Sequence, residues 1–502
     1  MKNLIVIFGL LAIFILKASA QTDIDALRYA TPSLQGTARN IGVGNTMSVV
    51  GADISATHSN PAGLAKFSST EITLSPGISF YKSNSNYLGN NTNDSKVKFQ
   101  VSNFGVAIAN RYKKENETKK WNGLKVGISF ARLANFNEKY YFKGFNDKNS
   151  LLNNYYDKLS DNTFITSEED AKTKYPFDAS IAYQLDLLSS DSVGNIFTAT
   201  NNGNMLQEYT IQKTGGMDEF AIGFASEYDS KFSIGASIGI PFINYTERIK
   251  LIETDTRDSA FNLNSFSNET YLKTRGTGFN VKIGVLYSPI KNLKLSLAFQ
   301  TPGFMFMKDD YKTTMEADYA NRTDILIGES PDGRSTYKYV QPWRLSAGAS
   351  YVHKVGFVAV EYELSDAQVS KFKLNQTDAS ARDYENFLNA QIKNKYGLFH
   401  TIKAGVEFKI QKFRMRAGIQ YRTSPFDKNA APTTINTDVI TYSGGLGYRM
   451  EHFFVDIAYT QTNTKELFIP YSINESFWKS AVPVATLKIK KPAIFFTVGY
   501  KL

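Results

Sequence analysis

Apolar and polar residues alternate with a period of two along most of this chain, and this pattern constrains its fold more than any other feature. In 402–410 the apolar positions are Ile402, Ala404, Val406, Phe408 and Ile410, with charged residues and glycine between them. The segments 232–242 and 413–422 show the same pattern. Such segments have one apolar face and one polar face, as strands do, whereas a helix needs apolar spacings of three and four.

The alternation and the intervening turn residues predict fourteen strands. They span approximately 71–81, 97–110, 123–135, 217–228, 231–251, 268–288, 291–301, 338–352, 355–366, 397–410, 412–424, 437–450, 452–465 and 485–502. Most short connections fall on one side. The long connections fall on the other, at 82–96, 136–216, 252–267, 302–337, 367–396, 425–436 and 466–484. Outer-membrane barrels have an even strand count, short periplasmic turns and long extracellular loops. We therefore expect an all-β, transmembrane antiparallel β-barrel of about 14 strands over 71–502, in place of a soluble β-sandwich.

The N-terminus predicts export. Lys2 precedes the apolar stretch from Leu4 to Leu16, and Ala18-Ser19-Ala20 offers a cleavage site before Gln21. This pattern is typical of a signal peptide over 1–20. The alternative is a short transmembrane helix, which the length of the apolar run disfavours. We expect a multi-pass protein of the bacterial outer membrane.

The composition of the chain excludes several kinds of chemical site. The chain has no cysteine, which excludes a lipoprotein anchor, disulfides and Cys-based metal sites. Its four histidines lack metal-ligand spacing, so we expect neither a metal nor a cofactor. The net charge of +10 is spread along the chain without a basic stripe, which argues against nucleic acid and for an anionic outer leaflet or carboxylate ligands.

Residues 21–70 do not resemble a pair of barrel strands, because they are rich in glycine and other small residues. Two interpretations remain open at this point. The segment is a disordered tail, or it is a plug (hatch) folded into the lumen.

Several motifs carry a family resemblance. The stretch from Ala52 to Leu64 contains Asn60-Pro61-Ala62-Gly63, 342–348 reads Pro-Trp-Arg-Leu-Ser-Ala-Gly, 416–425 ends in Ser-Pro, and 443–449 is glycine-rich. Together they resemble the FadL/TodX family of outer-membrane transporters. The resemblance implies a fourteen-stranded barrel that is plugged by its N-terminal segment and passes long-chain fatty acids or aromatic hydrocarbons.

The resemblance also implies site residues. Asn60, Pro61, Ala62 and Gly63 would lie in the lumen beside an inward kink of the third strand, which forms a lateral exit. Pro61 can fix a bend, and Asn60 can bond backbone groups that broken strand pairing frees. The alternative is an ordinary Asx-Pro turn.

The third expected strand, 123–135, gives independent support for a kink. Its apolar face runs to Phe130, so unbroken alternation would place Arg132 against lipid, which is costly near the midplane. A phase break close to Leu133 would turn Arg132 inward. The alternative is an interfacial arginine that extends its head group to water.

Three arginines lie on the polar faces of late strands. Arg414, Arg416 and Arg422 should point into the lumen, where they are candidates to attract a fatty-acid carboxylate. The alternative is an ion-pair network that fills the barrel.

These patterns predict a passive outer-membrane transporter for hydrophobic small molecules such as long-chain fatty acids. We expect a monomer in contact with outer-membrane lipid and lipopolysaccharide, and no enzymatic activity. The segment 235–239 matches G-x-S-x-G but lies within a regular strand, where no nucleophile elbow forms. Two alternatives stay open: a binding or shuttle protein of a type IX-like secretion system, and an outer-membrane lipase.

Overall fold

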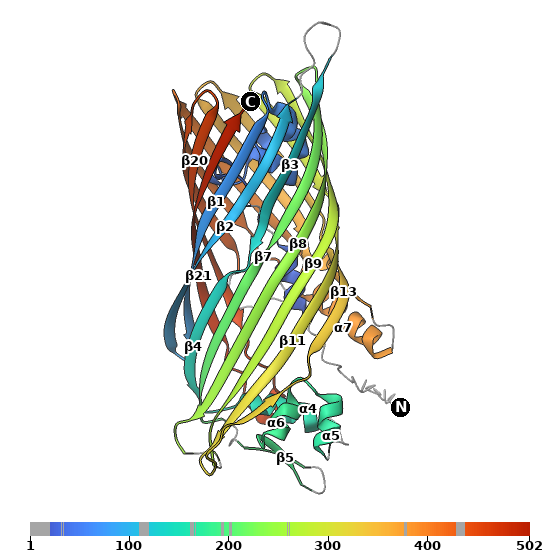
Figure 1. Ribbon diagram of the computed structural model, residues 1–502, viewed down its shortest axis with the longest axis vertical. Helices are drawn as coiled ribbons and strands as arrows, with labels where there is room; N and C mark the ends of the chain where they lie inside the picture. The colour runs from blue at the N-terminus through green and yellow to red at the C-terminus, as the bar shows by residue number, and fades with distance from the viewer. Residues whose placement is uncertain are drawn as a thin grey trace, which may run out of the picture.

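The computed structural model describes residues 21–31, 33, 35–109, 120–160, 165, 167–191, 195–199, 203–258, 260, 262–375, 379–427 and 437–502. The chain forms a tall, closed β-barrel with helices inside its lumen and at one end (Figure 1). The predicted signal peptide, 1–20, lies outside the described residues. Of the helices in the described part, none is both long and hydrophobic enough to cross a bilayer.

The barrel has fourteen antiparallel strands, as predicted. Ten are continuous: β1 (Glu71–Tyr87), β2 (Asn90–Ala109), β7 (Met205–Tyr228), β8 (Phe232–Asp255), β9 (Leu263–Ile290), β17 (Leu398–Ile410), β18 (Phe413–Arg422), β19 (Val439–Arg449), β20 (Phe453–Phe468) and β21 (Ala485–Lys501). Four are interrupted: β3 (Trp121–Asn135) with β4 (Glu138–Asn146), β10 (Leu293–Gln300) with β11 (Gly303–Tyr319), β13 (Gly333–Gln341) with β14 (Arg344–His353), and β15 (Gly356–Asp366) with β16 (Lys371–Leu374). β1 pairs with β21 and closes the ring.

Several strands are longer than the sequence predicted. The expected loops 82–96, 252–267 and 302–337 are wrong, because strand pairing continues through most of each; the last contains β11, β12 (Leu326–Glu329) and β13. Beyond the lipid belt a strand needs no apolar face, so alternation fades while the backbone ladder continues. In the β1–β2 hairpin, cross-strand amide bonds join Asn84 to Asn93 at 2.9 Å and Asn86 to Asn91 at 3.1 Å.

The two ends of the barrel differ as their connections predicted. Short turns join β7 to β8, β14 to β15 and β17 to β18 at one end. In the first of them, Asp229 and Ser230 have φ values of 51° and 55°, as a type I′ hairpin turn requires. The long connections emerge at the opposite end, which we therefore assign to the extracellular side.

The N-terminal segment lies inside the lumen and forms a plug (Figure 1). It consists of α1 (Asp23–Ala30), α2 (Ala38–Gly42), α3 (Met47–Val50) and two 3-10 helices, η1 (Ile54–His58) and η2 (Pro61–Lys66). Side chains of Thr22, Thr37, Asp53 and Asn60 cap four of these short helices. Because most plug residues are buried against the wall, the ordered plug replaces the alternative of a disordered tail.

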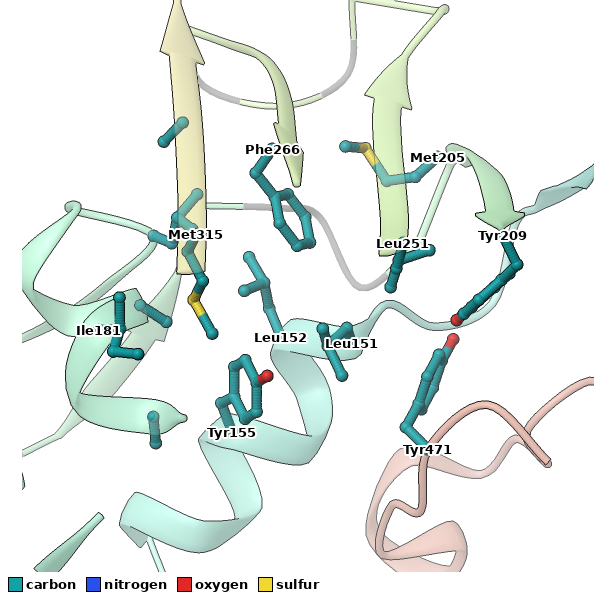
Figure 2. Close-up of a cluster of buried hydrophobic side chains, with 14 of the residues drawn as sticks. Leu151, Leu152, Tyr155, Ile181, Met205, Tyr209, Leu251, Phe266, Met315 and Tyr471 are labelled. Carbon is teal, nitrogen blue, oxygen red and sulfur yellow. The ribbon is translucent and has the colours of Figure 1, made fainter. Parts of the chain in front are cut away.

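The long connection between β4 and β7 folds over the extracellular end as a cap. It contains α4 (Leu151–Ser160), α5 (Glu168–Lys174), α6 (Ala179–Gln184) and the hairpin of β5 (Leu188–Ser190) and β6 (Ile196–Thr198). Figure 2 shows Leu151, Leu152 and Tyr155 of α4 pointing toward Leu251, Phe266 and Met315 of the barrel strands. This apolar cluster holds the cap on the rim. A second cluster joins α1 to α7 (Ala379–Lys395).

A buried carboxylate also holds the cap. Glu253 of β8 accepts hydrogen bonds from Ser150 Oγ at 2.5 Å, from the Leu151 backbone N–H at 2.9 Å and from Gln207 Nε2 at 2.8 Å. Its position is above the membrane, because the outward apolar face of β8 ends at Phe242. Burial raises the pKa of Glu253 to about 7.

Docking of the cap should therefore depend on pH. The folded state favours the protonated Glu253, whereas the undocked chain ionises near the ordinary carboxyl pKa. The resulting stabilisation is complete below that value and is lost as the pH rises through about 7. We expect protection of 151–160 in hydrogen exchange, corrected for intrinsic rates, to fall by roughly 2–3 kcal/mol between pH 5 and 8. Glu253→Gln should remove the pH dependence; the same slope in both proteins would contradict the assignment.

Candidate functional site

The wall of the barrel is interrupted at its third strand. β3 pairs with β2 only from Lys125 to Ala131, where Ala131 lies opposite Asn103, and the chain then breaks between β3 and β4 at 136–137. β4 pairs with β7 but not with β2, so β2 has no ladder partner on this side from Asn90 to Ser102. We call this interruption the seam.

A β-bulge and two glycines relax the backbone at the seam. The register between β3 and β7 shifts at Leu133, between Arg132 and Ala134. The glycines are Gly215 and Gly216 of the neighbouring strand β7. Gly215 has a φ of 109°, and its carbonyl accepts a hydrogen bond from the Phe136 N–H at 3.1 Å. A bulge bends a strand and re-aims its side chains. The sequence pointed to this stretch of the third strand, but the glycines of β7 were missed because they precede the predicted strand there.

The plug covers the edge of β3 that β2 leaves open. The backbone N–H groups of Ser33 and Gln35 donate to the carbonyls of Leu133 and Arg132 at 2.6 and 2.8 Å. Gln35 forms an isolated antiparallel bridge with Arg132. On the other side, Ser102 Oγ of β2 donates to the Gly36 carbonyl at 3.1 Å. Plug backbone thus bonds to both strands at the seam.

Polar side chains complete the seam. Arg132 faces the lumen side and pairs with Asp218 of β7 at 2.8 and 3.1 Å. Gln100 of β2 donates to Gln35 Oε1 at 2.8 Å and accepts from Asn135 Nδ2 at 2.8 Å. Arg132 therefore does not extend toward lipid. Phe130 precedes the bulge, where it lies opposite Phe104 of β2 and Phe220 of β7.

The Asn-Pro-Ala-Gly motif lies against two other strands. Asn60 caps η2 by accepting from the Ala62 N–H at 3.2 Å, and its Nδ2 donates to the Val285 carbonyl of β9 at 3.3 Å. Pro61 is the first residue of η2, a position that suits proline because it lacks an N–H. The plug residues that contact the seam are Ser33, Gln35 and Gly36, whereas Asn60 and Pro61 contact β8 and β9.

Lumen-facing glycines make room for the plug. A Cβ atom on Gly235 of β8 would lie 2.5 Å from the Pro61 carbonyl carbon and the Ala62 nitrogen, and one on Gly284 of β9 would lie 2.0 Å from Asn60 Oδ1. The same close approach to plug atoms occurs at Gly105, Gly127, Gly223, Gly348, Gly405 and Gly418. The G-x-S-x-G segment is part of this surface, because Ser237 Oγ donates to the Thr57 carbonyl at 2.8 Å.

A buried polar network fixes η1 of the plug to the wall. His58 Nδ1 lies 2.8 Å from Glu219 Oε1 of β7, and His58 Nε2 lies 2.6 Å from Ser129 Oγ of β3. Lys282 of β9 donates to Glu219 at 2.7 Å, and Asn280 donates to the other carboxylate oxygen at 2.7 Å. The Ser–His–Glu geometry has no free face, because each side chain is buried. Sequence analysis missed the network, because its members lie on four separate segments.

A lumenal cavity lies beside this network. Its lining includes Ser33, Asn45 and Ser59 of the plug and Phe399 of β17, and its charged residues are Arg344, Glu361, Glu363, Lys403 and Arg422. Lys403 bonds to Glu361 at 2.7 Å and to Glu363 at 3.0 Å, and Arg344 lies 3.3 Å from Glu363. Three cations thus face two carboxylates.

Arg422 is the cation left over. Its guanidinium donates to the Thr31 carbonyl at 3.2 Å, its Nε has no hydrogen-bond partner, and no carboxylate of the described residues lies within 4.0 Å. A partly buried guanidinium with a free donor attracts a carboxylate or phosphate.

The other two predicted arginines have different surroundings. Arg416 is fully buried and pairs with Glu407 and Asp456, both at 2.6 Å, which matches the alternative of an ion-pair network. Arg414 bonds to the carbonyls of Gln411 and Phe413 at the periplasmic turn. The three arginines therefore do not form one site. In the described residues, no group of three or more His, Asp or Glu side chains is arranged to hold a metal ion.

Comparisons with known proteins agree with this architecture. Residues 15–501 match the family model "Outer membrane protein transport protein (OMPP1/FadL/TodX)". A FadL homologue of Pseudomonas aeruginosa is 11% identical with a TM-score of 0.56, over 94% of this chain and 98% of that chain. The toluene transporter TodX of P. putida is 12% identical with a TM-score of 0.50, over 94% and 99%. No curated protein matches the chain. At such identities the structures show the shared fold.

The close approach of the wall glycines to the plug can be tested by substitution. Gly235→Ala should force the backbone of η2 away from β8, because the new Cβ would meet plug backbone atoms at 2.5 Å. We expect a destabilisation of about 1–3 kcal/mol, with faster hydrogen exchange over 52–66 and a larger single-channel conductance.

The matched control is Gly444→Ala, because the nearest atom to its Cβ would be the Arg416 carbonyl oxygen at 3.7 Å. This variant should behave like the wild type. Equal effects of both substitutions would show that the glycines do not act through contact with the plug.

Proposed function

Because the chain belongs to the OMPP1/FadL/TodX family of outer-membrane transport proteins, we propose that it carries long-chain fatty acids inward across the outer membrane without an energy source. The family comprises transporters of hydrophobic compounds, not enzymes. The choice of an acid with a long apolar chain as the ligand rests on one observation: the unpaired Arg422 beside the lumenal cavity.

The charge balance of the cavity favours an acid. Glu361 and Glu363 neutralise two of the three cations, so a ligand carboxylate would supply the missing charge for Arg422. A charge-assisted pair in a buried cavity is stronger than a neutral hydrogen bond. Phe399 lines the cavity and also belongs to the apolar cluster around α1, so an apolar surface adjoins the proposed head-group site. A neutral hydrocarbon would leave Arg422 without a partner.

The plug lies across the path, so passage requires it to move. Wall residues on several sides of the lumen hold the plug by hydrogen bonds. They include Thr497 of β21, Glu361 of β15 and Ser237 of β8. We place the exit at the seam, where a shift of Gln35 away from Arg132 would open the gap between β2 and β4. The ligand would then leave sideways into the bilayer, and Asn60-Pro61-Ala62-Gly63 would hold the deeper end of the plug during this movement.

The protein is proposed to act as a monomer in the outer membrane, after removal of its signal peptide. A closed barrel satisfies the backbone of its own edge strands, so it needs no second subunit for this purpose. Its outer wall would contact phospholipid on one leaflet and lipopolysaccharide on the other.

Substitution of Arg422 tests the ligand class. In cells lacking their own transporter, the wild-type chain should restore uptake of labelled oleate, and Arg422→Gln should weaken it. Loss of a charged hydrogen bond of about 1.5–3 kcal/mol corresponds to roughly 10- to 100-fold in affinity. Binding of oleyl alcohol, which has no carboxylate, should stay unchanged.

Arg414→Gln is the matched control, because Arg414 lies at the periplasmic turn outside the cavity. An equal loss of oleate and oleyl alcohol binding in Arg422→Gln would count against a head-group contact. Failure of the correctly inserted wild-type chain to take up oleate would sink the fatty-acid proposal and leave other apolar ligands or the secretion-shuttle alternative.

A disulfide lock tests movement of the plug. Thr57 Cγ2 would lie 3.2 Å from a Cβ atom on Gly223, so the pair Thr57→Cys and Gly223→Cys is placed for a disulfide. The chain has no other cysteine. Oxidation should abolish oleate uptake relative to the same double variant in reductant, with each single variant insensitive to oxidant. Normal uptake by the locked protein would rule out a route that needs η1 to leave β7.

A further inference from the structure

The outer wall carries four lysines in register on three neighbouring strands. Lys82 of β1 lies directly opposite Lys490 of β21, and Lys488 of β21 lies directly opposite Lys465 of β20. All four side chains are exposed, whereas the intervening Ile489 is buried toward the lumen. They therefore point outward together. We call them the lysine quartet.

The quartet has no counter-charge among the residues that the structure describes. Directly opposite residues on one face have Cβ atoms about 4.5–5.5 Å apart, and like charges at this spacing are destabilising. Two other lysines of β21 do have carboxylate partners: Lys491 with Glu138 at 2.5 Å and Lys501 with Glu71 at 3.4 Å. Within the described part of the chain, no carboxylate lies within 4.0 Å of any member of the quartet.

Elsewhere on the upper outer wall, cations are paired across strands. Arg248 of β8 bonds to Glu269 of β9 at 3.0 Å, and Lys250 lies 3.8 Å from Glu316 of β11. The uncompensated quartet is thus a local feature, not a general property of this rim. Charge of one sign at a fixed place points to a partner of the opposite sign.

The height of the quartet identifies the partner. A barrel strand needs about 9–11 residues to cross the hydrocarbon, and the stretch from Lys490 to Tyr500 has this length. Below the quartet, the outward residues are the lipid-facing Phe496, Val498 and Tyr500. The lysines therefore stand at the level of head groups in the extracellular leaflet, beside acyl chains that pack on the apolar belt.

We infer that the lysine quartet binds the phosphate groups of a phosphorylated glycolipid of the outer leaflet, of the lipid A type. Two adjacent pairs of ammonium groups match a head group that carries more than one phosphate. Each lysine near a charged bilayer surface strengthens binding by a factor of up to about ten. Four lysines on one face therefore give a specific site. The inference concerns the outer wall, and its test does not depend on what the lumen carries.

The test compares two quadruple variants of the full chain, purified free of lipopolysaccharide and shown to be folded by resistance to unfolding in dodecyl sulfate. The first variant carries K82Q, K465Q, K488Q and K490Q. The control carries K291Q, K354Q, K409Q and K412Q, which remove the same charge from exposed positions at the periplasmic end. The probe is bisphosphorylated lipid A in detergent micelles, with monophosphorylated lipid A and inorganic phosphate as further arms.

We expect the quartet variant to bind bisphosphorylated lipid A at least about tenfold more weakly than the wild type, and the control to bind it normally. Wild-type affinity should also fall for the monophosphorylated lipid and with added salt, whereas inorganic phosphate should not compete at millimolar concentration. Unchanged binding by the quartet variant would overturn the inference. If that variant does not fold, salt-independent binding by the wild type, or equal affinity for both lipids, would overturn it.

Discussion

The structure depends on one requirement of the bilayer: backbone N–H and C=O groups have no water to bond with, so each must find a partner inside the protein. Pairing of β1 with β21 meets it by closing the ring. At the seam the ladder between β2 and β3 stops at Ala131, and backbone groups of the plug take over at Arg132 and Leu133. The plug therefore does two things at once. It blocks the lumen, and it bonds to the edge of β3 that β2 leaves open.

Two kinds of contact hold the plug. Glycines on eight strands let its backbone approach the wall closely, which gives packing without large side chains. Buried polar bonds, such as His58 with Glu219, add orientation, because breaking one side of a buried pair costs more than the pair contributes. Several lumenal charges are paired, as Arg416 is with Glu407 and Asp456, whereas Arg422 has no carboxylate partner among the described residues.

Sequence reasoning succeeded where the signal was local and repeated. Period-two alternation predicted the strand count, and the alternating connection lengths predicted that short turns lie at one end of the barrel and long connections at the other. It failed where polar strands continue above the membrane, as in 82–96 and 302–337, because alternation weakens there while hydrogen bonding does not. Of the three arginines on β18, the sequence could not distinguish Arg416, which is paired twice, from Arg422, because their partners come from distant strands and from the plug.

The sequence by itself determined the class of this protein: a closed barrel of fourteen strands, a small-residue segment ahead of it and the motif around Asn60. These properties follow from composition and period, which are local. Only the tertiary structure decided which groups meet: Gln35 with Arg132 at the seam, Gly235 with Pro61, His58 with Glu219, and the lysines of β1, β20 and β21 on one outer face. Strand register determines which of these groups come into contact. Register depends on the closure of the whole ring, which cannot be deduced from a single sequence.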